Sequence, residues 1–148
     1  MTDWTTVMNE NHILLVEDNP DDELLALRAF KKSKISHRVE VARDGHEAVD
    51  YLFRIDDTES LPKVVLLDLQ LPKMSGLDVL KAIREYPRTQ LLPVVVLTSS
   101  DEQRDMVESY RLGANSFIRK PVDFTQFVDL IRQLVTYWMK MNMTPENC

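Results

Sequence analysis

The side chains best suited to chemistry in this sequence are carboxylates, a hydroxyl and a lysine, and each comes at the C-terminal end of a segment that reads as a short strand. They are Glu17, Asp18, Asp68, Thr98 and Lys120. Three carboxylates brought close together repel one another unless a cation lies between them. Carboxylate oxygens favour Mg²⁺, and no histidine or cysteine accompanies them, which disfavours zinc.

The same residue types suit the transfer of a phosphoryl group to Asp68. An aspartate can accept a phosphoryl group and form an acyl phosphate. A metal ion and Lys120 would neutralise the charge on the phosphoryl oxygens, and the hydroxyl of Thr98 would donate to one of them. The set therefore predicts a phosphoryl-accepting aspartate rather than an isolated acid. Taken singly, each acid could also be an ordinary charged residue after a strand.

The elements that must position these residues follow from the apolar runs. Residues 13–16, 64–67 and 93–97 are continuously aliphatic, which is typical of strands buried on both faces of a parallel sheet. Residues 38–42 alternate, and residues 115–119 form a shorter run. Segments with helical spacing separate the runs, so the chain reads as β-α repeated five times in one α/β domain. Parallel strands end on one edge of a sheet, so the residues after them should meet there.

Composition limits the function classes. The chain has 148 residues and a net charge of −6, which argues against general binding to nucleic acid or to acidic membranes. Its single cysteine, Cys148, leaves no disulfide or cysteine-based metal site. No signal peptide or membrane-spanning run is readable, so we expect a cytoplasmic protein.

The set Glu17-Asp18, Asp68 with Pro72, Thr98-Ser99 and Lys120-Pro121 resembles the receiver domain of two-component response regulators. The resemblance covers roughly residues 12–140. It implies a doubly wound (βα)5 flavodoxin-like fold, with strand order 2-1-3-4-5 and helices on both faces of the sheet.

The resemblance also implies a role for each site residue. Asp68 accepts a phosphoryl group from a sensor histidine kinase, without the turnover of an enzyme. Mg²⁺ is held by Glu17, Asp18, Asp68 and the backbone carbonyl of Gln70. The phosphoryl-binding and switch residues are Thr98, Ser99, Lys120 and Phe117, and the Lys120–Pro121 bond is cis. Because Gln70 and Ser100 are not strong bases, we expect slow loss of the phosphoryl group.

Short motifs give a narrower resemblance. Val-Glu-Asp-Asn-Pro-Asp-Asp at 16–22, Ala-Arg-Asp-Gly at 42–45, Ala-Asn-Ser at 114–116 and Tyr137-Trp138 look like the stand-alone regulators paired with bacterial phytochrome kinases. A light-sensing pathway is therefore one expectation. A phosphorelay intermediate and a chemotaxis-like adaptor for another kinase are the alternatives. A Mg²⁺-dependent aspartyl-phosphate hydrolase, a flavodoxin-like electron carrier and a static adaptor are less favoured.

The flanking segments suggest how such a receiver would act. We expect residues 1–11 to be a flexible extension, residues 12–140 the receiver domain and residues 141–148 a tail, with no output domain. Signalling would then pass through protein contacts. The final helix, expected to run to about Lys140, has an inward apolar stripe that includes Phe124. Leu130, Tyr137 and Met141 lie off this stripe, which predicts a homodimer through that helix.

Overall fold

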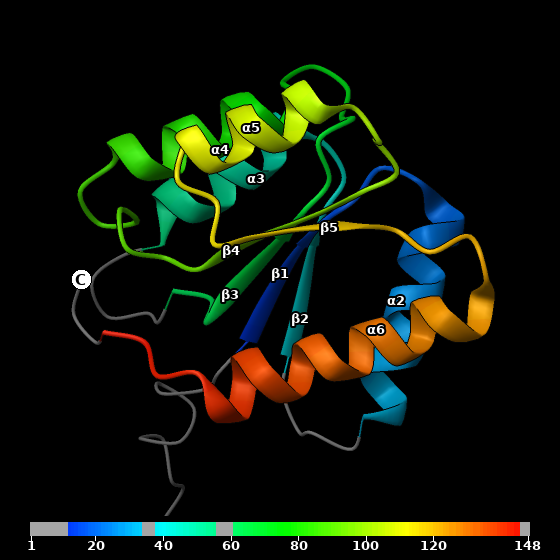
Figure 1. Cartoon of the computed structure of the whole chain (residues 1–148). Coiled ribbons are helices and arrows are strands. Elements are labelled where there is room, and N and C mark those ends of the chain that lie inside the picture. Colours follow the sequence, from blue (N-terminus) through cyan, green and yellow to red (C-terminus); the bar gives the residue numbers. More distant parts are fainter. Residues whose placement is uncertain (1–11, 34–37, 56–60, 146–148) are drawn as a thin grey trace, which may run out of the picture.

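A parallel five-stranded sheet forms the centre of the computed structural model (Figure 1), which describes residues 12–33, 38–55 and 61–145. The strands run in the order β2-β1-β3-β4-β5, so the predicted fold class is confirmed. Their bounds are β1 (His12–Val16), β2 (Arg38–Ala42), β3 (Val64–Leu67), β4 (Val94–Thr98) and β5 (Ser116–Arg119). Every residue of β1, β3 and β4 is buried, as their continuous apolar runs require.

Helices cover both faces of the sheet (Figure 1). On one face α2 (Pro20–Lys32) packs against α6 (Phe124–Thr136). On the other face α4 (Gly76–Glu85) lies between α3 (Gly45–Arg54) and α5 (Gln103–Arg111). Each layer has its own apolar cluster, because alternate strand residues point to opposite faces of the sheet. None of the helices in the described part of the chain is long and apolar enough to cross a bilayer.

Side-chain caps start most of these helices close behind the strand that precedes them. The Oδ1 atom of Asn19 accepts from the amides of Asp21 and Asp22, and Asp44, Ser75 and Asp123 cap α3, α4 and α6 in the same manner. The helix α5 begins differently, because Glu102 is its cap residue and makes no side-chain bond there. The sequence favours Ser100 or Asp101 as the cap of this helix, and that expectation is wrong.

The C-terminal end of α6 also departs from expectation. The α-helix ends at Thr136, and the chain continues as a π-helical turn, η1 (Tyr137–Met141). Lys63, just before β3, donates from Nζ to the Met139 carbonyl oxygen at 3.0 Å, and this bond ties the turn to the sheet.

The first residue of α6 also differs from its expected place. Phe124 was expected on the inward apolar stripe of the helix, but its side chain is 49% exposed because it begins the helix.

Candidate functional site

The hydrogen bonds between neighbouring strands continue just beyond the strand ends, and they hold the backbone of the site residues. The amide of Glu17 donates to the carbonyl oxygen of Ala42 at 2.9 Å, and that of Asp68 donates to Val16 at 3.1 Å. The Lys120 amide donates to the Thr98 carbonyl oxygen at 2.8 Å. Glu17, Asp68 and Lys120 therefore keep the strand register at the edge of the sheet where ligands bind in such folds.

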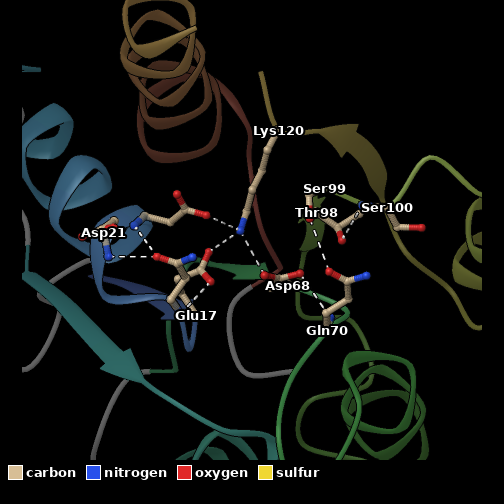
Figure 2. A network of polar contacts seen from close by, with 10 residues as sticks. Glu17, Asp21, Asp68, Gln70, Thr98, Ser99, Ser100 and Lys120 are labelled. Carbon is tan, nitrogen blue, oxygen red and sulfur yellow. Dashed lines mark hydrogen bonds and ion pairs between the residues drawn. The ribbon is translucent and has the colours of Figure 1, made fainter. Parts of the chain in front are cut away.

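Lys120 is the centre of the site. Its Nζ atom lies 2.6 Å from Oε1 of Glu17, 3.0 Å from Oδ2 of Asp68 and 2.9 Å from Oδ2 of Asp22. Figure 2 shows the lysine reaching between Glu17 and Asp68. An ammonium group has three hydrogens, so three carboxylates use its full donor capacity.

Burial and charge shift two pKa values in this cluster. Burial alone would lower the pKa of Lys120, but its bonds to Glu17 and Asp22 and the charge of Asp68 raise it instead, so the lysine stays charged. Burial raises the pKa of Glu17 to about 7, despite the opposing effect of Lys120. A metal ion binding near neutral pH would therefore displace protons from Glu17 in part of the molecules.

Three acids are placed to hold a divalent metal ion. Ligand oxygens of Glu17, Asp18 and Asp68 all lie within 4.8 Å of one another. Glu17 and Asp68 are buried, whereas Asp18 is exposed, so the group opens to solvent on one side. An all-oxygen set with room for waters fits Mg²⁺. These residues would hold the ion, and the ion would supply positive charge for phosphoryl oxygens.

The hydroxyl residues lie beside the acids, at the end of β4 (Figure 2). Thr98 is fully buried, and its Oγ1 accepts from the amide of Ser100 at 3.2 Å. Ser99 is exposed and donates from Oγ to Oε1 of Gln70 at 3.3 Å. The Gln70 amide in turn donates to Oδ1 of Asp68 at 3.2 Å. Phe117 is half-buried on β5.

The backbone of Gly76 lies against the backbone of Asp68. A Cβ atom added to Gly76 would lie 2.2 Å from the carbonyl oxygen of Asp68, and the Gly76 amide donates to the Leu69 carbonyl oxygen at 2.9 Å. Between these residues Lys73 has a φ of 68° and centres a turn in which the Met74 amide donates to Pro72. Only glycine permits α4 to begin so close to the end of β3.

The predicted cis bond between Lys120 and Pro121 is wrong. The structure has no cis peptide bond among the described residues. The trans isomer of an X–Pro bond is favoured by about 0.5–1 kcal/mol, and Lys120 reaches its three carboxylates with the bond in that form.

The structure adds Asp22 to the residues expected at the site, through its contact with Lys120. In sequence it belongs with Pro20 and Asp21 as ordinary helix-start chemistry, which it also provides. Only the spacing of the acids in the sequence could have indicated this contact. Asp22 follows the pair Glu17-Asp18 by about one helical turn, and it lies in the first turn of α2, close behind that pair.

The family model described as "Response regulator receiver domain" matches residues 13–132. The chain belongs to this family. The fold is thus that of a receiver domain. Such regulators are generally signalling proteins without enzymatic turnover.

Among curated proteins, the chain is 41% identical over 135 residues to "Probable methanogenesis regulatory protein FilR2" of Methanothrix harundinacea. That match covers 90% of this chain and 86% of the relative. Among solved structures, bacteriophytochrome response regulator RtBRR is 46% identical, with a TM-score of 0.70 and 93% and 86% of the two chains covered.

Two cyanobacterial structures align more closely in space. The phosphorylated phytochrome response regulator RcpA gives a TM-score of 0.86 at 35% identity, covering 93% of this receiver and 99% of RcpA. The Mn²⁺-bound form of Rcp1, from Synechocystis, gives 0.84 at 33% identity, covering 91% and 99%. This chain is therefore related to phytochrome-associated regulators, and a related receiver binds a divalent metal ion.

Proposed function

We propose that this receiver accepts a phosphoryl group on Asp68 from the phosphohistidine of a sensor kinase. The observation that carries the proposal is the 3.0 Å contact between Nζ of Lys120 and Oδ2 of Asp68, beside an acid group suited to Mg²⁺. A carboxylate oxygen of Asp68 forms the new bond to phosphorus. The P–N bond of the donor breaks, and its electron pair returns to the imidazole, which takes up a proton.

The neighbouring residues have distinct proposed roles. Glu17, Asp18, Asp68 and the Gln70 carbonyl hold Mg²⁺, which offsets the charge of the incoming group. Lys120 binds a phosphoryl oxygen. Thr98, and Ser99 next to it, supply hydroxyl donors, while Phe117 follows the movement of Thr98. A hydrolase of this type needs an acidic residue two places after the nucleophile, to protonate the leaving group. Gln70 occupies that place and is not an acid, so we propose slow loss of phosphate rather than turnover.

Incubation with acetyl phosphate is expected to add one phosphoryl group per chain when Mg²⁺ is present. Intact-protein mass spectrometry should detect the added mass, and EDTA should prevent it because the acid group then lacks its cation. A chain that gains no mass at millimolar acetyl phosphate with Mg²⁺ would contradict the proposal. Steady release of phosphate from a phosphate ester would instead favour the hydrolase.

We further propose a sensor histidine kinase of the bacteriophytochrome type as the partner in the cytoplasm. The 46% identity to RtBRR supports this pathway. The 41% identity to "Probable methanogenesis regulatory protein FilR2" supports the alternative, in which the receiver serves another kinase as a relay or adaptor. Phosphotransfer from a purified bacteriophytochrome kinase, compared with an unrelated kinase, distinguishes the two.

Homodimerisation through the last helix is also proposed. Tyr137 is 47% exposed and Met141 is 66% exposed, whereas Leu130 packs against the core and contributes less than its sequence position suggested. A groove of about 460 Å³ contains both an acid and a base, so Asp129 of one copy could face Arg132 of another in a two-fold interface. It is lined by Ser33, Asp129, Arg132, Gln133, Thr136, Tyr137 and Met141.

Replacing Tyr137 with glutamate is expected to weaken the dimer by about tenfold or more in dissociation constant, because the change puts a charge into an apolar contact. Sedimentation equilibrium at micromolar concentration, with and without beryllofluoride, measures this. Met143→Glu is the matched control, since Met143 is 92% exposed and does not line the groove. A wild-type protein that remains monomeric under both conditions would refute the dimer.

A further inference from the structure

Lys120 contacts three acids, and two of them belong to the metal group. Glu17 and Asp68 can each offer an oxygen to the ion, whereas Asp22 is not part of that group. A bound divalent cation attracts the oxygens of Glu17 and Asp68 and so weakens their bonds to the ammonium group. Asp22 is the partner of Lys120 for which the metal does not compete.

The position of Asp22 fits this separate role. It lies in the first turn of α2, and its amide is held by Oδ1 of Asn19 at 3.1 Å. Its Oδ2 lies 2.9 Å from Nζ of Lys120, whose side chain is only 8% exposed. The Asp22 side chain is 29% exposed, so this bond is partly shielded from water.

We propose that Asp22 is a positioning residue that holds the Lys120 ammonium in place when metal occupies the site. The inference rests on the proposed phosphorylation of Asp68. A lysine side chain is long and flexible, and fixing its charged end before the reaction lowers the cost of organising the transition state. With Asp22 retained, the two hydrogens released by Glu17 and Asp68 can turn toward the phosphoryl oxygens.

An alternative role for Asp22 predicts the opposite result. If the residue acted only through its negative charge, it would repel the anionic phosphoryl donor, and its removal would speed the reaction. Asp21 provides the matched control. It carries the same charge in the same turn of α2, and its amide bonds the same Asn19 oxygen, but in the described part of the chain its side chain makes no contact with Lys120.

The test compares Asp22→Ala with Asp21→Ala in the full chain. The initial rate of phosphorylation by acetyl phosphate is measured at saturating Mg²⁺, and Mg²⁺ affinity is measured by calorimetry. Asp22→Ala is expected to slow phosphorylation by roughly tenfold relative to Asp21→Ala, as loss of a charge-assisted hydrogen bond implies. Mg²⁺ affinity should be similar in the two variants. Asp22→Asn, which retains an oxygen acceptor, should fall between Asp22→Ala and wild type.

Two results would overturn the proposal. One is an Asp22→Ala rate equal to or above that of Asp21→Ala. The other is a loss of Mg²⁺ affinity that accounts for the slower rate, because Asp22 would then act through the metal. A wild-type chain that takes up no phosphoryl group refutes the proposed function itself, so the two failures are distinguishable.

Discussion

Replacing Asp68 with asparagine is expected to abolish phosphorylation by acetyl phosphate. Asparagine keeps the size of the side chain, and its amide oxygen can still accept from Lys120, but it lacks a nucleophilic carboxylate. Glu17 and Asp18 are not expected to substitute. Glu17 is held by Lys120 and the Asn19 amide, and Asp18 lies exposed at the rim of the site. Mass spectrometry after incubation with Mg²⁺ and acetyl phosphate should show no added mass.

Asp78→Asn is the control for this experiment. Asp78 is an exposed acid in the first turn of α4 and is not among the described ion-pair partners of Lys120, so its removal changes net charge equally and should leave phosphorylation intact. A phosphoryl group retained by Asp68→Asn would place the acceptor elsewhere. Peptide mapping of the product would then locate it.

Replacing Lys120 with methionine is expected to destabilise the metal-free protein by about 2–4 kcal/mol at pH 8, because the change leaves buried carboxylates without their cation. The side chains of Glu17 and Asp68 are only 5% and 6% exposed. Methionine fills a similar volume, so the loss reports mainly on charge. Urea unfolding in EDTA measures it. Saturating Mg²⁺ should restore part of the stability, since the ion replaces the missing positive charge.

The loss of stability caused by Lys120→Met should depend on pH. Folding raises the pKa of Glu17 from 4.5 to about 7, so the native state binds more protons than the unfolded state in that interval. Ionising Glu17 therefore costs stability as pH rises. At pH 5 the variant can protonate Glu17, and the loss should be smaller than at pH 8. Lys81→Met, at an exposed position of α4, is the control and should lower stability little at either pH. If Lys120→Met lost the same free energy of unfolding at both pH values, the loss would not arise from the charge of Glu17.

The sequence predicted the sheet and most of the site because both depend on local pattern. Aliphatic runs gave the buried strands, and parallel strands bring the residues that follow them to one edge. Glu17, Asp68 and Lys120 are thus predictable from chain order alone.

Features that depend on tertiary contacts or small energies were not predictable. Asp22 pairs with a lysine 98 residues away, and no local pattern in the sequence specifies that contact. X–Pro bonds in general favour the trans isomer by only about 0.5–1 kcal/mol, so the residue types alone do not decide the isomer at Lys120–Pro121. The burial of Leu130 and the π-helical turn at Tyr137 depend on packing that helical periodicity does not specify.

The place of β5 at the end of the strand order has a mechanical consequence. An edge strand is hydrogen-bonded to one neighbour only, here β4, whereas β3 is bonded on both sides. Asp68 therefore follows a strand that is bonded on both sides, and Lys120 follows a strand that is bonded on one side only. If Asp68 accepts a phosphoryl group as proposed, we expect the resulting shift to be larger at β5 and the start of α6 than at β3.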